Sequence, residues 1–272
     1  MTHDANRPAA KGQPLTVMVP IRNFAGGIRQ FLDAWSKALS AETSEFEVIV
    51  IDDASEDGTA EVVREYSAKH AYVSLIQHET PQGLGAAVRS GFAVSRHGLI
   101  LIVSPDWPYR PSDLPAMVEA MKGADVVSPF RPGIVRPRWQ QSLLRFARVL
   151  ARIIVGVEWP SQSAWYGGKD FRRRFGWRVW FGLRLQDPTC GVRLLRRWVL
   201  ERCPIQSDSS FALIEMYAKA NFAGALFNEV ALGRAGNIPV MHGPFAVNPS
   251  DEKRVFRSPE FHPALATESK TG

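Results

Sequence analysis

FEVIVIDDASEDGTAEVVREYSAKH (46–70) contains a strand and a helix joined by a short polar turn, and this succession indicates the class of fold. Its first six residues are nearly all apolar, which is typical of a strand buried on both faces of a parallel sheet. Asp52 and Asp53 close the strand, Asp57-Gly58 turns the chain, and an apolar 3.6-residue period then predicts a helix. Ligands of open α/β sheets bind beyond the carboxyl ends of the strands, so the two acids are candidate ligand-binding residues.

The same succession of strand and helix recurs through the first half of the chain. Alternation of nearly apolar strands with amphipathic helices favours an α/β fold with a mostly parallel central sheet flanked by helices. After residue 131 the pattern changes to a basic amphipathic helix (138–156) and an arginine-rich aromatic segment (165–185). The expected strands are 14–20, 46–53, 71–78, 99–103 and 124–129, with 225–232 as a further one, and the other expected helices are 26–39, 57–70, 83–97, 111–123 and 211–224.

Composition excludes several classes of protein. With 45% apolar and 22% charged residues among 272, the chain has ordinary globular values and can bury a sizeable core. Cys190 and Cys203 form no CxxC pair, which argues against a disulfide framework or a structural zinc site and fits a reducing compartment. Residues 1–13 lack a signal-peptide core, and no stretch approaches the about 18 apolar residues of a membrane span. We therefore expect a cytoplasmic protein whose membrane contact is peripheral.

The first strand-to-helix turn, PIRNFAGGI (20–28), distinguishes between two kinds of ligand. An acid after the second strand also binds the ribose of a dinucleotide in a Rossmann fold. That fold needs GxGxxG in the first turn, so that the backbone can approach the pyrophosphate, whereas Gly26 and Gly27 are adjacent here. The turn therefore argues against a dinucleotide cofactor.

LILIVSPDWPYRP (99–111) presents a single acid, Asp106, after another apolar strand. The residue types allow two interpretations. Asp106 caps the turn before Pro108 and Pro111, or it meets a metal or a ligand at the carboxyl edge of the sheet. These residues alone leave both interpretations open.

Seven segments in one order resemble inverting family-2 glycosyltransferases with the GT-A fold. Within that family they are similar to the polyprenol-phosphate glycosyltransferases typified by dolichol-phosphate mannose synthase. The resemblance covers about residues 15–234. The segments are VMVPIRN (17–23), VIVIDDASEDGT (48–59), QGLGAAVRSGF (82–92), SPD (104–106), ADVVSPFRP (124–132), DPTCGVRLLRR (187–197) and FALIEMYAKANFAGALFNEVAL (211–232).

The resemblance implies a UDP- or GDP-sugar as donor. Asp53, with Asp52 beside it, would accept hydrogen bonds from the base. The other implied nucleotide-binding residues are Pro20 and Asn23 in the first loop (20–28) and Gly83 and Gly85 in the stretch 82–85, which we call the glycine loop. Arg89, on the following helix, is also implied.

The resemblance also implies a reaction centre. Asp106 would hold a divalent cation, Mg²⁺ or Mn²⁺, against the donor diphosphate, where a hard cation offsets the leaving charge. Arg131 would lie on the diphosphate or acceptor side, and Asp187 and Arg193 near the acceptor. The sequence offers no clear acid for deprotonating a sugar hydroxyl. An acceptor that is already a phosphate anion needs little help from a base, so we expect a polyprenol-phosphate-like acceptor. The resemblance to inverting glycosyltransferases implies transfer with inversion.

The sequence departs from the family pattern at the metal motif and in two loops. Ser104 stands where the family has the first aspartate of DxD, and Pro105 stands where it has alanine. Phe24 replaces the acid that usually follows the loop asparagine, and Gln82 replaces a frequent lysine. Ser104 and Phe24 therefore keep open a catalytically silent protein that binds a nucleotide-sugar. Among enzymes, the alternative is transfer to a hydroxyl of a glycan or small molecule.

Positive charge is concentrated in residues 131–184, which carry a net charge of +10 against −4 for the rest of the chain. Five of the eight tryptophans also lie in this segment. Three interpretations compete: a solvated basic face over aromatic packing, a nucleic-acid groove and a membrane surface. We expect a membrane surface or lipid phosphate, and no nucleic acid. The expected contact residues are Arg145, Arg148, Arg152, Trp177 and Trp180.

These observations suggest one catalytic domain over residues 14–234. It divides into a nucleotide-binding half (14–131) and an acceptor half (132–234) that carries a basic aromatic insertion. Residues 1–13 are expected to be a disordered lead-in, and 235–272 a polar tail that is disordered or ordered only on binding. The sequence indicates no oligomeric state.

Overall fold

The computed structural model describes residues 11–105, 109–130, 182–183, 185–188, 190–231 and 249–262. Strands and helices alternate through its first half, as the sequence pattern predicts. In chain order the elements are β1 (Leu15–Ile21), α1 (Ile28–Glu42), β2 (Phe46–Asp52), α2 (Thr59–Ser67), β3 (Val73–Gln77), α3 (Leu84–Val94), β4 (Leu99–Ile102), the 3₁₀ turn η1 (Pro111–Asp113), α4 (Leu114–Ala120), β5 (Val126–Phe130), β6 (Arg193–Arg196), α7 (Arg197–Arg202), α8 (Ala212–Phe222), β7 (Phe227–Ala231) and α9 (Pro249–Arg257).

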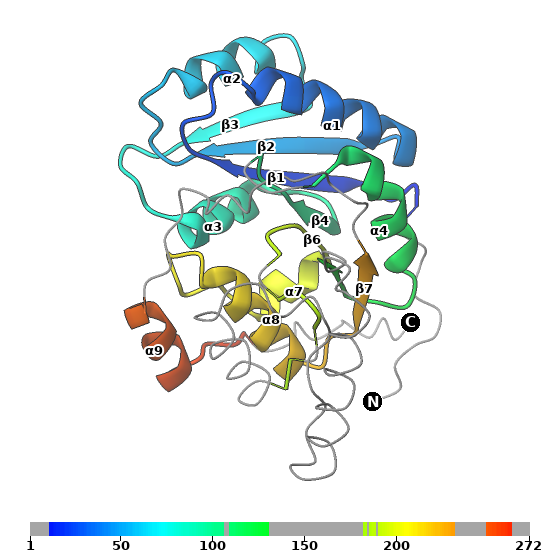
Figure 1. Ribbon diagram of the computed structural model, residues 1–272, viewed down its shortest axis with the longest axis vertical. Helices are drawn as coiled ribbons and strands as arrows, with labels where there is room; N and C mark the ends of the chain where they lie inside the picture. Colours follow the sequence, from blue (N-terminus) through cyan, green and yellow to red (C-terminus); the bar gives the residue numbers. More distant parts are fainter. Residues whose placement is uncertain are drawn as a thin grey trace, which may run out of the picture.

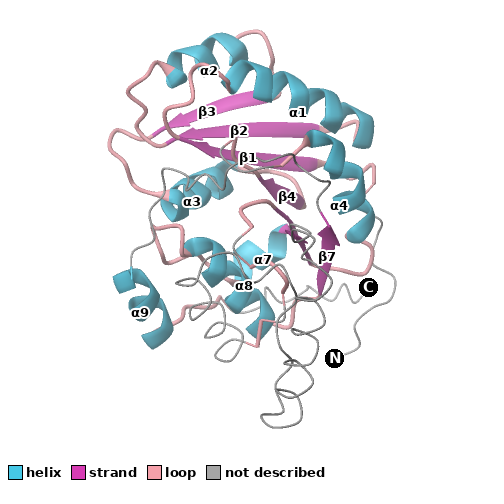
Figure 2. Ribbon diagram, in the orientation of Figure 1, coloured by secondary structure: helices cyan, strands magenta, loops and turns pink. Residues whose placement is uncertain are grey.

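Within the described ranges the strands form one seven-stranded sheet in the order β3-β2-β1-β4-β6-β5-β7. Figure 2 shows the first part of this order, with β3, β2, β1 and β4 side by side. β1 pairs in parallel with β2 and β4, β2 with β3, and β5 with β7. β6 runs antiparallel to both of its neighbours, β4 and β5. The predicted mostly parallel sheet is confirmed. The sequence pattern does not predict β6, because its four residues begin and end with arginine and are too few to show a period.

Helices cover both faces of this sheet (Figure 1). Successive side chains of a strand point to opposite faces, so Val17 and Val19 of β1 join one core and Met18 joins the other. α1, α2 and α4 pack on the first face, and α3, α7, α8 and α9 pack on the second. Burial on both faces explains why the central strands are apolar at nearly every position.

The C-terminal tail contains a docked helix, α9, where the sequence predicts no pattern. Val255 is 1% exposed, and Phe256 meets Phe211 edge to face with 5.2 Å between the ring centroids. The prediction of a disordered tail is therefore wrong for residues 249–257. The helix is polar along most of its length, and its order comes from tertiary contacts that no local period reveals.

The described helices include none with both the length and the apolar character needed to cross a bilayer. The expected basic helix (138–156) and the aromatic segment after it lie almost entirely outside the described residues. Their proposed membrane contact stays a prediction.

Candidate functional site

The carboxyl ends of β1, β2, β3 and β4 lie along one edge of the sheet. In the strand register Ile21 is opposite Asp52, and Asp52 is opposite Gln77. β4 ends beside β1, where the Val103 amide donates to the Met18 carbonyl at 3.0 Å. The loops that leave these strands therefore share one edge, which is where open α/β sheets bind their ligands.

Asp53 holds the glycine loop against this edge. Its carboxylate accepts hydrogen bonds from His78 Nδ1 at 2.8 Å and from the amides of Gln82 and Gly83 at 2.8 and 2.9 Å. The residue is 1% exposed. Three donors from the chain itself already occupy Asp53, so it is less suited than its neighbour to the predicted role of base ligand.

Asp52 keeps one free oxygen. Its Oδ1 accepts hydrogen bonds from the amide and the hydroxyl of Ser55, whereas Oδ2 has no hydrogen-bond partner among the described residues although the residue is fully buried. Burial raises the pKa of Asp52, and the Asp57 and Asp53 carboxylates raise it further, against the lowering effect of Ser55. An unsatisfied buried acceptor costs about 1–3 kcal/mol, so a ligand N–H that reaches Oδ2 would relieve that cost.

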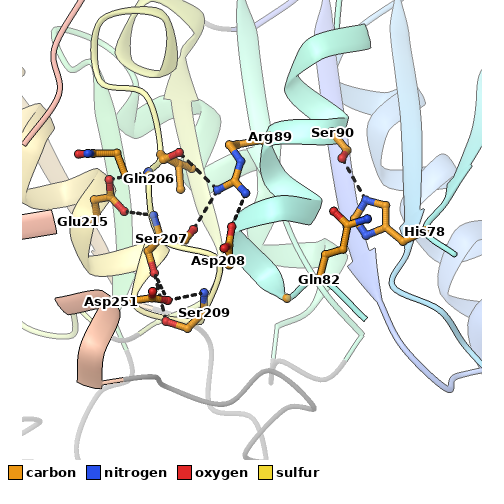
Figure 3. Close-up of polar contacts among 12 residues, drawn as sticks. His78, Gln82, Arg89, Ser90, Gln206, Ser207, Asp208, Ser209, Glu215 and Asp251 are labelled. Atoms are coloured by element: carbon orange, nitrogen blue, oxygen red, sulfur yellow. Dashed lines mark hydrogen bonds and ion pairs between the residues drawn. The ribbon is translucent and has the colours of Figure 1, made fainter. Parts of the chain in front are cut away.

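His78 connects three elements behind the two acids. A carboxylate only accepts, so His78 Nδ1 is the donor to Asp53. In the neutral imidazole Nε2 then accepts from the Ser90 hydroxyl of α3, 3.0 Å away (Figure 3). The His78 amide also donates to the Asp52 carbonyl at 2.9 Å. The imidazole therefore ties the end of β2 and the glycine loop to α3.

We expect His78→Ala to lower the free energy of unfolding by about 2 kcal/mol, because Asp53 and Ser90 each lose a buried partner. His78→Asn should lose less, since the amide nitrogen of Asn can take the place of Nδ1 and donate to Asp53. Urea unfolding of both variants, with Ser90→Ala as the reference for the second hydrogen bond, measures the difference. Equal losses for Ala and Asn at position 78 would mean that the imidazole contributes packing alone.

Asn23 and the turn after β2 hold each other in place. Asn23 has a φ of 57°, a left-handed conformation that asparagine tolerates better than most residues. Its Oδ1 accepts a hydrogen bond from the Glu56 amide at 2.9 Å, and its own amide donates to the Ser55 hydroxyl at 2.8 Å. Pro20 lies just before this loop, within β1. The first loop is therefore held in position at the carboxyl edge.

Gly83 and Gly85 pack against a second loop (204–209), which we call the support loop. The Gly85 amide donates to the Asp208 carbonyl at 2.9 Å, and a Cβ at Gly85 would overlap the Ser207 carbonyl oxygen. Gly83 has a φ of 93°, and a Cβ at this position would overlap the Asp208 carbonyl oxygen. Contact between two main chains thus explains both glycines. Their predicted approach to a nucleotide stays a prediction.

Arg89 reaches the same support loop from α3. Its Nη1 donates to the Ser207 carbonyl at 3.1 Å, and its guanidinium pairs with Asp208 (Figure 3). These contacts give Arg89 a supporting role in the described structure. Its predicted contact with the nucleotide is a separate expectation that these contacts do not test.

Asp187 and Arg193 lie at the two ends of the segment that leads into β6. Arg193 is opposite Ile102 in the strand register, so it lies beside the end of β4. Its guanidinium is fully buried, and Nη2 donates to the carbonyls of Pro188 and Cys190 at 3.3 and 3.0 Å. Nε and Nη1 have no hydrogen-bond partner among the described residues. The guanidinium also lies over the Tyr217 ring, 4.0 Å from its centroid, so its charge already meets an aromatic face. The role of Arg193 on the acceptor side stays a prediction.

The expected metal ligand, Asp106, lies outside the described residues, where β4 has ended and the chain is described as far as Pro105. Over the ranges that are described, the His, Cys, Asp and Glu side chains form no group of three suited to a metal ion. The metal centre therefore stays a prediction. Also outside the described residues are Arg131, Arg145, Arg148, Arg152, Trp177 and Trp180.

Two parts of this site have little local signal in the sequence. His78 only ends an apolar run, and the support loop is a short polar stretch between two helices. Both contribute through contacts with residues distant in the chain, such as the pairing of Arg89 with Asp208. The sequence gives one signal for His78, which is its position directly after an apolar strand. It gives none for the support loop.

The comparison with protein-family models matches residues 16–201 to the family described as Glycosyl transferase family 2. Among curated proteins, the chain is 33% identical over 118 residues to a dolichyl-phosphate beta-glucosyltransferase from Trichomonas vaginalis, covering 42% of this chain and 35% of that protein. It is 32% identical over 178 residues to an undecaprenyl-phosphate mannosyltransferase from Micrococcus luteus, covering 61% of each. The chain thus spans between about a third and three fifths of the length of these relatives.

Among solved structures, the chain resembles glucosyl-3-phosphoglycerate synthase from Mycobacterium tuberculosis. The TM-score is 0.54 at 17% identity, over 89% of this chain and 75% of that one. That protein was crystallised with Mn²⁺, uridine-diphosphate-glucose and phosphoglyceric acid. At this identity the likeness bears on the fold, which is the GT-A fold that the sequence motifs imply. The family model, which covers more than half of the chain, together with the collinear motifs and this fold, shows that the chain belongs to glycosyl transferase family 2.

Proposed function

We propose that the protein transfers a sugar from a UDP- or GDP-sugar to a polyprenol phosphate, with inversion and with the help of a divalent cation. The observation that carries the proposal is the free, buried Asp52 oxygen at the carboxyl edge of a family-2 fold. The named relatives support the acceptor, because both act on a polyprenyl phosphate. The basic aromatic segment supports a site of action at the cytoplasmic face of a membrane.

The chemistry of Asp52 supports the choice of donor base. Uracil and guanine each carry a ring N–H, which a carboxylate oxygen can accept. The corresponding ring nitrogens of cytosine and adenine are hydrogen-bond acceptors, so they would repel Oδ2, which is also an acceptor. Because Asp52 is fully buried, a base can reach Oδ2 only if a neighbouring group shifts.

Asp106 is the residue we propose for binding the cation, and Arg193 is the residue we propose near the anionic acceptor. One carboxylate is enough for Mg²⁺ when substrate phosphates and waters complete its shell, so the replacement of the first aspartate by Ser104 is compatible with binding. The cation, when bound, supplies counter-charge to the leaving nucleoside diphosphate. The free donors of Arg193 would orient the acceptor phosphate, which attacks the sugar without first losing a proton to the enzyme.

The test is a transfer assay with labelled UDP- and GDP-sugars, undecaprenyl phosphate in detergent, and Mg²⁺ or Mn²⁺. We expect a labelled lipid product with inverted anomeric configuration, and no product from Asp106→Ala. Transfer to a water-soluble phosphorylated acceptor, and not to the lipid, would contradict the proposed polyprenol-phosphate acceptor. Nucleotide binding without transfer to any acceptor would identify the silent alternative that Ser104 raises.

A second assay tests the proposed membrane contact. We expect binding to vesicles that contain anionic lipid, weakened when Arg145, Arg148 and Arg152 are replaced together by glutamine. Binding that is unchanged in this variant would contradict a role for these arginines at the membrane.

A further inference from the structure

We infer that α9 controls the affinity of the donor site, and that Asp251 is a positioning residue for nucleotide binding. The inference rests on the proposed function, since it concerns the same nucleotide site. It adds a helix that lies outside the segments similar to the family, and it assigns that helix a role beyond covering the sheet.

Asp251 holds the support loop from the side of α9 (Figure 3). Its Oδ2 accepts hydrogen bonds from the Ser207 hydroxyl at 3.1 Å and from the Ser209 amide at 3.2 Å. Arg254, one turn further along α9, pairs with Asp251 at 3.2 Å and donates to the Gln206 carbonyl at 2.8 Å. Burial acts to raise the pKa of Asp251, but the hydrogen bonds from Ser207 and Ser209 outweigh it and lower the pKa. The residue is therefore an anion bound to the loop.

The same loop residues contact the glycine loop through their main chain. The Ser207 and Asp208 carbonyls lie against Gly85 and Gly83, so closely that neither position has room for a side chain. Ser207 thus touches Asp251 with its hydroxyl and Gly85 with its carbonyl. A shift of the support loop would therefore change the position of the glycine loop directly.

The glycine loop in turn is hydrogen-bonded to Asp53, one of the two acids at the donor site. The Gly83 amide donates to Asp53, which is adjacent to Asp52 in the chain. The contacts therefore form one continuous series from α9 to the carboxyl edge. α8 fixes the start of the support loop, because Glu215 accepts from the Gln206 and Ser207 amides at 2.8 and 2.9 Å. Asp251 supplies the acceptor for the part of the loop that follows.

Loss of Asp251 would leave the Ser207 hydroxyl and the Ser209 amide without this acceptor. The loop would then sample more conformations, and nucleotide binding would have to restore the order that Asp251 now maintains. Coupling between two sites is reciprocal, so a bound nucleotide should in turn stabilise α9. A purely structural role for Asp251 predicts a loss of stability in its variants with no change in the Kd of the folded protein.

The experiment measures Kd for UDP and GDP by calorimetry with Mn²⁺, well below the unfolding temperature of each variant. We expect Asp251→Ala to weaken binding about tenfold. Asp251→Asn keeps one acceptor oxygen and should weaken it less, and it provides a second variant if the alanine form is unstable. Lys253→Ala, on the exposed side of α9, is the matched control and should bind as the wild type does.

Amide hydrogen exchange of residues 249–257 gives the reciprocal measurement. Saturating nucleotide should slow exchange in the wild-type helix and have no effect on it in Asp251→Ala. The inference would be overturned if both Asp251 variants bound nucleotide with the Kd of the wild type, or if nucleotide did not change the exchange rate of α9 in the wild type. Either result would leave the proposed function intact. A wild type that binds neither nucleotide would overturn both.

Discussion

Gly85→Ala is expected to destabilise the protein by about 3 kcal/mol and to abolish nucleotide binding. An alanine methyl group at this position would overlap the Ser207 carbonyl oxygen and lie 2.8 Å from the Ser207 carbonyl carbon and 3.1 Å from the Ala212 Cβ. The obstacle is main chain, which cannot rotate away, so the support loop must separate from α3. Helix propensity alone predicts the opposite effect, because replacing glycine with alanine in a helix raises the free energy of unfolding by up to about 1 kcal/mol.

Gly91→Ala is the matched control, because it makes the same change on the same helix. Its methyl group would approach the ends of two side chains, Ile51 Cδ1 at 2.9 Å and Met18 Sδ at 3.1 Å, and both can shift. We expect its free energy of unfolding to stay within about 1 kcal/mol of the wild type. Urea unfolding and nucleotide titration of both variants make the comparison. A Gly85→Ala protein as stable as Gly91→Ala would contradict the close contact between the glycine loop and the support loop.

Glu215→Gln is expected to lower the free energy of unfolding by about 3–5 kcal/mol, because it leaves the Lys219 ammonium without a buried counter-charge. Glu215 is fully buried and Lys219 is 2% exposed, with 2.7 Å between the carboxylate and Nζ. Lys219 also donates to the Pro204 carbonyl and to Gln206 Oε1, both at 2.6 Å. The pair therefore supports the start of the support loop as well as the interior of α8.

Two comparisons isolate the charge effect. Glu201→Gln breaks a pair with Arg197 at the same i,i+4 spacing, but the side chains of Arg197 and Glu201 are 29% and 37% exposed. The loss in free energy of unfolding should therefore stay below about 1 kcal/mol. The double variant Glu215→Gln/Lys219→Met removes both buried charges. Its loss in free energy of unfolding should be smaller than the sum of the losses in the two single variants. Strict additivity, measured by chemical denaturation, would show that the two side chains contribute independently.

The order of elements in the first half of the chain could be predicted from the sequence. Its signal is local, since a buried parallel strand such as β2 is apolar at nearly every position and the helix after it has a 3.6-residue period. β6 and α9 could not be predicted in this way. β6 is short and bounded by arginines, and α9 docks through a few apolar residues such as Val255.

The position of the two acids could be predicted from the sequence, whereas their hydrogen bonds could not. Asp52 and Asp53 lie at the end of β2, on the carboxyl edge, as the sequence pattern indicates. Which of the two has a free oxygen depends on partners elsewhere in the chain. Asp53 is occupied by His78, and Asp52 is bonded only on Oδ1. The reason for Gly85 was equally hidden, because its neighbour in space is Ser207, more than a hundred residues further along.

Titration of the wild type and of Asp52→Asn with UDP, GDP and CDP in the presence of Mn²⁺ tests the central claim most directly. We expect UDP or GDP to stabilise the wild type by about 2.7 kcal/mol at a hundredfold excess over Kd, with CDP much weaker. Asp52→Asn is isosteric and can keep its hydrogen bonds with Ser55 through Oδ1, but its Nδ2 is a donor in the place of Oδ2, which we propose as the acceptor for the base. The variant should therefore lose the preference for UDP over CDP. Equal stabilisation of the wild type by UDP, GDP and CDP, or an unchanged preference in Asp52→Asn, would contradict a donor site built on Asp52.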